Sequence, residues 1–142
     1  MLKTKISYTL EETKELANEF AKVIKTGDLI FLKGNLGAGK TTFMKALSTC
    51  LNGIDENEVQ SPTYTYINSY PGTPTIHHFD LYRLNSFEQF KSMGLDEFLF
   101  SEAICCIEWA ERLPELNTMA NWIVEFKHLD NTHRNIKISH AN

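Results

Sequence analysis

The chain has 142 residues, which leaves room for one domain over residues 1–142. Hydrophobic residues make up 42% and charged residues 23%, a composition that excludes disordered and collagen-like proteins. The formal net charge is −4, and the three arginines (Arg83, Arg112 and Arg134) are scattered, so the chain lacks the broad basic face of proteins that bind nucleic acid directly.

Two further features concern where the protein works. No segment approaches the roughly 18 apolar residues of a membrane span, and the N-terminus lacks the apolar core of a signal peptide. The three cysteines, Cys50, Cys105 and Cys106, lack metal-ligand spacing, and the last two lie in an apolar run where they are expected to be buried. We therefore expect a soluble cytoplasmic protein that makes no contact with a membrane.

The first half of the chain predicts strands that alternate with helices. A short extended segment covers Lys3–Tyr8, and a capping box at Thr9 and Glu12 begins a helix that carries an apolar stripe through about residue 25. Leu29–Leu32 is typical of a strand buried on both faces of a parallel sheet. A second helix is predicted over Thr41–Leu51.

The second half predicts hairpins and short helices. We expect Thr63–Tyr70 and Thr75–Phe79 to form a hairpin. A helix over Ser86–Met93, a helical turn over Leu95–Ser101 and a buried strand over Ala103–Ile107 follow. The strands Trp122–Lys127 and Asn135–Ser139 form a terminal hairpin. The fold class is α/β, with a mixed, partly antiparallel central sheet flanked by helices.

A phosphate-binding pattern lies between the first buried strand and the second helix. Residues 34–41 read GNLGAGKT, which matches G-x-x-x-x-G-K-[ST]. Glycines let successive amides point at phosphate oxygens, and the helix that follows directs its positive end to the same place. The residues expected to bind the nucleotide are Asn35, Leu36, Gly37, Ala38, Gly39, Lys40, Thr41 and Thr42.

The roles within this loop follow from side-chain chemistry. Lys40 supplies charge to the β- and γ-phosphates, the Thr41 hydroxyl is placed to ligate Mg²⁺, and Thr42 is a candidate for the α-phosphate. The pattern thus predicts a single-domain P-loop nucleotide-binding protein with ATP or ADP and Mg²⁺ as cofactors.

Two carboxylates follow β-like segments and are candidates for the catalytic acids. Glu108 ends an apolar run, and we assign it to Mg²⁺, directly or through water; Asp80 ends a more polar run, and we place it beside the γ-phosphate to orient water. Either could instead be a surface acid at a strand end. His77 and His78 are poor joint metal ligands, because alternation along a strand directs them to opposite faces.

Four short segments in order make the chain resemble the TsaE family, also called YjeE. They read GNLGAGKTT at residues 34–42, SPTY at 61–64, HFDLYR at 78–83 and EW at 108–109, and the likeness covers essentially the whole chain. The resemblance implies a small ATPase required to form N6-threonylcarbamoyladenosine at position 37 of tRNAs that read codons beginning with A. It also implies partners, TsaB and TsaD, which hold the tRNA, so that this chain contacts tRNA only indirectly and resets the complex between turnovers. ATPase activity is expected to be weak without these partners.

The resemblance also carries roles onto individual residues. It implies that Lys40 and Thr41 hold phosphates and Mg²⁺, that Glu108 is the second metal-side carboxylate, and that Asp80 is the catalytic or switch acid.

Other roles are left open at this point. Thr63 either senses the γ-phosphate or only enters the hairpin; Trp109 packs near the site, on a partner or in the core; Arg83 stabilises charge on the γ-phosphate or pairs with Asp80. Candidates for contacting adenine are Thr9, His133 and Arg134.

Two rival functions share the phosphate loop. A non-hydrolysing nucleotide sensor would bind ATP and change shape without turnover. A small-molecule kinase would require an arginine-rich lid. The chain has three scattered arginines and no insertion of lid length, which makes a kinase a poor candidate.

Overall fold

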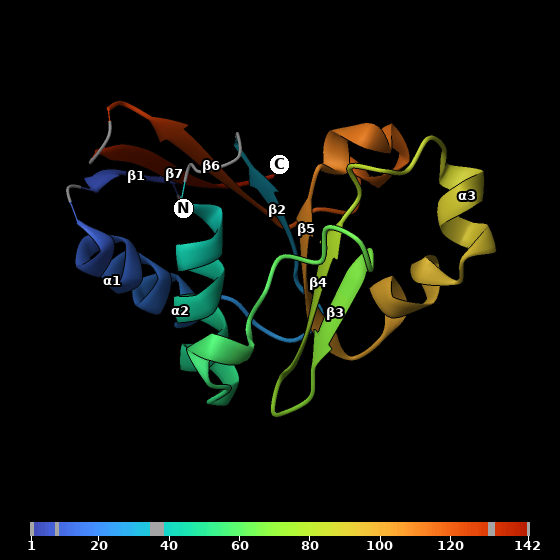
Figure 1. Cartoon of the computed structure of the whole chain (residues 1–142), viewed down its shortest axis with the longest axis horizontal. Helices are drawn as coiled ribbons and strands as arrows, with labels where there is room; N and C mark the ends of the chain where they lie inside the picture. Colours follow the sequence, from blue (N-terminus) through green and yellow to red (C-terminus); the bar gives the residue numbers. More distant parts are fainter. Residues whose placement is uncertain (1, 8, 35–38, 131–132, 142) are drawn as a thin grey trace.

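A seven-stranded mixed sheet organises the computed structural model, which describes residues 2–7, 9–34, 39–130 and 133–141 (Figure 1). The strands are β1 (Leu2–Ser7), β2 (Leu29–Lys33), β3 (Ile67–Tyr70), β4 (Thr75–Asp80), β5 (Ala103–Glu108), β6 (Trp122–His128) and β7 (Arg134–His140). Their order across the sheet is β1-β7-β6-β2-β5-β4-β3. The four central strands β6, β2, β5 and β4 are parallel, and antiparallel pairs complete both edges. The predicted mixed, partly antiparallel sheet is confirmed.

Helices cover both faces of this sheet. The α-helices are α1 (Leu10–Ala21), α2 (Lys40–Asn52) and α3 (Phe87–Ser92), and the short 3₁₀ helices are η1 (Glu56–Glu58), η2 (Leu95–Phe100), η3 (Ala110–Arg112) and η4 (Pro114–Leu116). Helices α1 and α2 lie on one side of the sheet and α3 on the other (Figure 1). One buried cluster joins α1 and α2 to one sheet face, and a second lies under α3, η2, η3 and η4 on the other. Alternate residues of β5 enter different clusters, Cys106 the first and Cys105 the second, as expected of a strand buried on both faces.

The first helix begins where the sequence predicts and ends earlier. The Thr9 hydroxyl accepts a hydrogen bond from the Glu12 amide at 3.1 Å, as a helix cap does. The helix stops at Ala21 instead of about residue 25, because the Lys25 amide donates to the Asp28 carboxylate at 3.0 Å. This local bond folds residues 25–28 into a turn that leads into β2.

The strand predicted over Thr63–Tyr70 is wrong in its first half. Residues 63–65 form a turn, Tyr66 has a positive φ of 68°, and its amide donates to the Pro62 carbonyl at 3.1 Å. Pairing with β4 therefore starts only at Ile67. Residues 61–64 form a loop that leads to the edge strand, and their side chains do not belong to the sheet.

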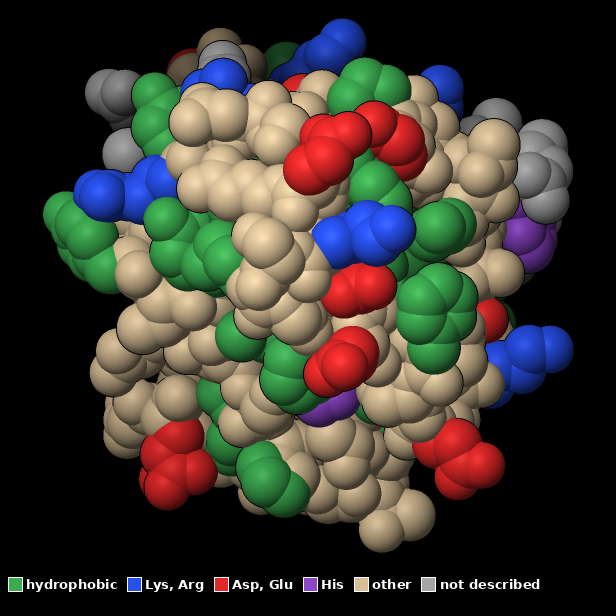
Figure 2. All heavy atoms as spheres, turned by 90° about the vertical axis from the view of Figure 1, so that its right-hand side faces the viewer, with side chains coloured by type: hydrophobic (Ala, Val, Ile, Leu, Met, Phe, Trp, Pro, Cys, Tyr) green, Lys and Arg blue, Asp and Glu red, His purple; other side chains and the backbone are tan. Residues whose placement is uncertain are grey.

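The face of the molecule that carries α3 has no single apolar patch. Hydrophobic side chains on this face occur in small groups, with charged side chains and other, uncoloured surface between them (Figure 2). The exposed apolar side chains around α3 and η2 include Met93 and Phe100.

No helix among the described residues is both long enough and apolar enough to pass through a membrane.

Candidate functional site

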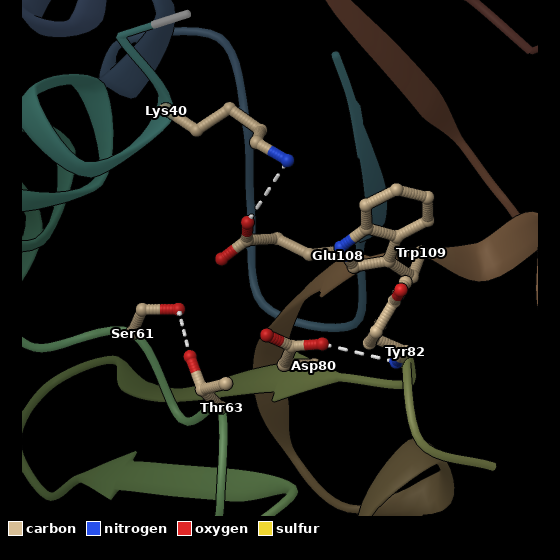
Figure 3. A pocket seen from close by; sticks show the side chains of 7 residues that line it. All are labelled: Lys40, Ser61, Thr63, Asp80, Tyr82, Glu108 and Trp109. Atoms are coloured by element: carbon tan, nitrogen blue, oxygen red, sulfur yellow. Dashed lines mark hydrogen bonds and ion pairs between the residues drawn. The ribbon is translucent and has the colours of Figure 1, made fainter. Parts of the chain in front are cut away.

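The carboxyl ends of β4 and β5 and the start of α2 surround one cavity of about 390 Å³ (Figure 3). Its lining residues are Lys40, Ser61, Thr63, Asp80, Tyr82, Glu108 and Trp109. An adjoining cavity of about 230 Å³ shares four of these residues and extends along the start of α2 to Gly39, Thr41, Thr42 and Arg134. Carboxyl ends of parallel strands are the usual place for ligands in such sheets.

Lys40 is the first residue of α2, and its side chain is buried. Its Nζ donates to the Gly34 carbonyl at 2.7 Å and lies 3.2 Å from Glu108 Oε1. Gly34 has no room for a side chain, because an added Cβ would lie 2.7 Å from the Phe126 carbonyl oxygen. The close approach of Gly34 to β6 thus fixes the position of Gly34, and with it the position of the Gly34 carbonyl that accepts from Lys40.

Glu108 is the last residue of β5 and is held at both carboxylate oxygens. Oε1 meets Lys40, and Oε2 lies 2.6 Å from His78 Nε2. Burial alone raises the pKa of Glu108, but the hydrogen bond and charge of His78 and the charge of Lys40 outweigh it and hold the pKa below its usual value. Glu108 is therefore a firmly ionised carboxylate at the cavity wall.

Asp80 is the last residue of β4 and stands beside Glu108 in register. Its Oδ1 accepts from the Tyr82 amide at 3.0 Å, and its other oxygen faces the cavity (Figure 3). Burial raises the pKa of Asp80, and the charge of Glu108 raises it further against the lowering effect of the Tyr82 amide, His78 and Lys40. Asp80 is thus the carboxylate of the pair with the greater affinity for a proton.

Aromatic rings form one wall of the cavity. Trp109 adopts a positive φ of 60° directly after Glu108, and Lys40 Nζ lies 5.5 Å from the centre of its ring. The Tyr82 ring packs against Trp109 at 4.8 Å, and the Arg112 guanidinium covers Tyr82 at 4.8 Å. Of the alternatives for Trp109, the structure shows packing beside the site. Ser61 and Thr63, whose hydroxyls lie 3.3 Å apart, form the opposite wall (Figure 3).

The structure separates the predicted residues into those it brings together and those it does not. Lys40, Asp80, Glu108, Thr41 and Thr42 line the two cavities. The segment Asn35, Leu36, Gly37 and Ala38 lies outside the described residues, so its predicted amide contacts are untested.

The pairing of Arg83 with Asp80 is wrong. The Arg83 guanidinium lies over the exposed ring of Tyr64, 4.3 Å from its centre, and among the described residues no ion pair joins it to Asp80. The physical reason is the turn that precedes β3, which presents Tyr64 as a flat partner outside the cavity.

The candidates for adenine contact have different surroundings. Arg134, the first residue of β7, packs against Gly39, where an added Cβ would lie 2.7 Å from its Cδ. His133 precedes it, and its amide donates to the Asp130 side chain at 2.8 Å. Thr9 caps α1. Contact of these three residues with a base stays a prediction.

The sequence reasoning missed His78 as a partner of the site. The predicted alternation along β4 is confirmed: His78 contacts Glu108, whereas His77 bonds to Ser69 on the neighbouring strand and packs against Phe98 on the other sheet face. The same period of two places His78 on the face of Asp80, and that signal could have found it. Ser61 and Tyr82 lie in the segments SPTY and HFDLYR, but the sequence predicted no role for either side chain.

The donor set favours a small, hard cation held jointly with a ligand. Within the described part of the chain, no three His, Cys, Asp or Glu side chains lie close enough to hold a metal on their own. Asp80 and Glu108 supply carboxylate oxygens, and Thr41, on the first turn of α2, supplies a hydroxyl to the adjoining cavity. One or two carboxylates completed by phosphate oxygens and water is how Mg²⁺ is commonly held, so these residues fit it.

Comparison with known proteins places the chain in a family. Residues 7–136 match the family model described as threonylcarbamoyl adenosine biosynthesis protein TsaE. The tRNA threonylcarbamoyladenosine biosynthesis protein TsaE of Treponema pallidum is 39% identical over 114 residues, which cover 78% of this chain and 83% of that protein. The protein of the same name from Aquifex aeolicus is 37% identical over 139 residues, covering 97% of this chain and 96% of that one.

A solved structure agrees with the sequence relatives. The crystal structure of Bacillus subtilis YdiB matches 100% of this chain and 87% of its own, with a TM-score of 0.75 and 27% sequence identity. With the family model spanning nearly the whole chain, this protein belongs to the TsaE family, and its role lies in the biosynthesis of threonylcarbamoyladenosine in tRNA.

Proposed function

We propose that this chain is an Mg²⁺-dependent ATPase that supports formation of N6-threonylcarbamoyladenosine at position 37 of tRNAs reading codons that begin with A. It acts with TsaB and TsaD, resets their complex between turnovers, and does not transfer the threonylcarbamoyl group itself. The observation that carries the proposal is the 3.2 Å approach of Lys40 to Glu108 in the cavity that Asp80 also lines. A P-loop lysine beside two strand-end carboxylates is the residue set that phosphoryl transfer to water needs.

Each of these residues has a distinct part. Lys40 leaves Glu108 and places its charge on the β- and γ-phosphates, where it stabilises charge that grows in the transition state. The Thr41 hydroxyl and the freed oxygen of Glu108 would hold Mg²⁺, which supplies charge neutralisation at the phosphate oxygens. Asp80 directs its free carboxylate oxygen at the attacking water and orients it, as its place on the cavity wall allows.

Charge and composition support an indirect role toward tRNA. The chain carries a net charge of −4, and two of its three arginines, Arg83 and Arg112, are stacked on tyrosines. Neutralising several phosphates of a tRNA requires a cluster of basic side chains. We therefore assign tRNA binding to the partner subunits.

The decisive experiment is reconstitution of tRNA modification with TsaB and TsaD, with and without this chain, scored over several rounds. We expect modification to stop after about one round without the chain and to continue with it and ATP. Single-turnover hydrolysis, measured with the partners present, separates the ATPase from the sensor. If modification depends on ATP binding while the wild type hydrolyses none, the chain is a sensor; a phosphorylated metabolite would identify a kinase.

A further inference from the structure

The geometry points to His78 as a positioning residue for Glu108: it fixes one carboxylate oxygen, so that the other stays directed at the nucleotide cavity when Lys40 departs. This inference rests on the proposed function, because it concerns the carboxylate to which we assign Mg²⁺. It adds a residue that touches neither nucleotide nor metal and acts only through Glu108.

The contact between His78 and Glu108 is short and buried. His78 is 1% exposed, and its Nε2 lies 2.6 Å from Glu108 Oε2. Glu108 Oε1 lies 3.2 Å from the Lys40 ammonium, and in this ion pair the carboxylate accepts hydrogen bonds. His78 Nε2 must therefore carry the proton, which fixes the donor in this bond.

The rest of the His78 ring makes no competing bond. Nδ1 is buried and lacks a hydrogen-bond partner among the described residues. In the described part of the chain, Glu108 is thus the single hydrogen-bond partner of this side chain.

The two partners of Glu108 have different freedom. Lys40 is a long side chain on α2 that also donates to the loop carbonyl of Gly34, and the proposed function requires it to move onto phosphate. His78 is a rigid ring within β4, the strand next to β5. When Lys40 moves, Oε1 becomes available at the cavity, while His78 keeps Oε2 and the side-chain torsions in place. Mutation of a residue that orients a metal ligand typically weakens metal binding by about 10–100-fold.

The neighbouring histidine is a matched control. His77 is also buried, but it lies on the opposite face of β4, where its Nδ1 pairs with the Ser69 hydroxyl at 2.8 Å and its ring packs against Phe98. A substitution at His77 perturbs the same strand and removes the same kind of ring without touching Glu108.

The test compares His78→Leu, which removes the donor, with His78→Gln, whose amide reaches the position of Nε2, and His78→Asn, whose amide is too short. The matched controls are His77→Leu and His77→Gln. Binding of Mn²⁺ to the protein–ADP complex is followed by electron paramagnetic resonance. Binding of ADP with EDTA is followed by calorimetry, and single-turnover ATP hydrolysis is measured with the partners.

We expect His78→Leu to bind Mn²⁺ about 10–100-fold more weakly and to hydrolyse ATP correspondingly slowly, while its metal-free affinity for ADP matches the wild type. His78→Gln restores most of the Mn²⁺ affinity, and the His77 variants bind like the wild type. If His78→Leu does not fold, the same contrast is expected between His78→Asn and His78→Gln.

Two results overturn the inference while leaving the proposed function intact. One is wild-type Mn²⁺ affinity in His78→Leu or, where that variant does not fold, in His78→Asn. The other is equal weakening in the His77 and His78 variants, which would reveal a general effect on β4. Failure of the wild type itself to bind Mn²⁺ with ADP or to hydrolyse ATP contradicts the proposed function instead.

Discussion

Asp80 and Glu108 end neighbouring parallel strands in register, and their pKa values shift in opposite directions. Burial raises both pKa values, but only Glu108 has compensating partners close by, His78 at 2.6 Å and Lys40 at 3.2 Å. Asp80 has one backbone donor and faces the negative charge of Glu108. The sheet thus creates one carboxylate that stays ionised and one that is costly to ionise.

The first prediction concerns the stability of the nucleotide-free protein when Asp80 is replaced by Asn. Asn retains the oxygen that accepts from the Tyr82 amide but removes a carboxylate that is buried beside Glu108. We expect Asp80→Asn to raise the free energy of unfolding at neutral pH by about 0.5–2 kcal/mol, the range that single stabilising substitutions commonly give. Urea unfolding at several pH values is the measurement.

The pH dependence gives this prediction its sign. A folded-state pKa above the unfolded value of 3.8 means that the native protein binds more protons between those two values. Wild-type stability therefore falls as the pH rises through that interval, and the advantage of Asp80→Asn is absent below it and complete above it. An advantage that shrinks with rising pH would show that Asp80 is stabilised, not penalised, as a carboxylate.

For Glu108 we predict the opposite dependence of stability on pH. Its folded-state pKa lies below the ordinary value of 4.5, so ionised Glu108 stabilises the fold fully above that pH and progressively less as the pH falls through the lowered pKa. We expect Glu108→Gln to be destabilised at neutral pH and to approach its parent in acid. Because Asp80 titrates with the opposite sign, the comparison is best made in the Asp80→Asn background, by urea unfolding of the single and double variants. Equal stability at neutral pH would mean that His78 and Lys40 do not favour the charge.

Much of this site follows from local rules that act along one strand. A glycine-rich loop between a buried strand and a helix places Lys40, and β-like runs that end in acids place Asp80 and Glu108. Period-two alternation separates His77 from His78, and the Thr9 cap depends on residues three apart. These features need no knowledge of which strands are neighbours.

The features that escaped prediction depend on contacts between distant segments. The bond of His78 to Glu108 exists because β4 and β5 pair in one register, and no local pattern in the sequence identifies which strands are neighbours. The residues around Tyr66 are of the types that form strands, but Tyr66 has a positive φ, and β3 therefore pairs with β4 only from Ile67 onward. Arg83 has an aromatic partner, Tyr64, in a loop whose path is set by that same turn.

A third prediction separates binding from hydrolysis. Lys40→Ala removes the charge that approaches both Glu108 and the phosphates, so we expect weak ATP binding and no turnover. Asp80→Ala and Glu108→Ala leave the lysine in place, and they should reduce single-turnover hydrolysis far more than they reduce ATP binding. Calorimetry and hydrolysis assays with the partners present provide the two readouts. Equal loss of binding and hydrolysis in the carboxylate variants would identify Asp80 and Glu108 as structural.

The last prediction concerns Gly34, whose carbonyl accepts a hydrogen bond from Lys40. A Cβ at this position would lie 2.7 Å from the carbonyl oxygen and 3.0 Å from the Cβ of Phe126, and the φ of 149° is unfavourable for other residues. Phe126 lies in β6, which pairs with strands on both sides, so its backbone cannot retreat. Gly27 is the matched control, because it has a φ of 96° but nothing within 4 Å of an added Cβ.

We expect Gly27→Ala to cost about 1–2 kcal/mol in the free energy of unfolding from backbone strain alone. Gly34→Ala should cost about 1–3 kcal/mol more through overpacking against β6, and it should also weaken ADP binding because the loop start moves with its carbonyl. Urea unfolding and ADP calorimetry on both variants test the two effects. Equal destabilisation, or ADP affinity retained in Gly34→Ala, would mean that the loop does not depend on this close approach. A large loss of stability and of ADP affinity in Gly34→Ala alone would show that the contact between Gly34 and β6 holds Lys40 in position.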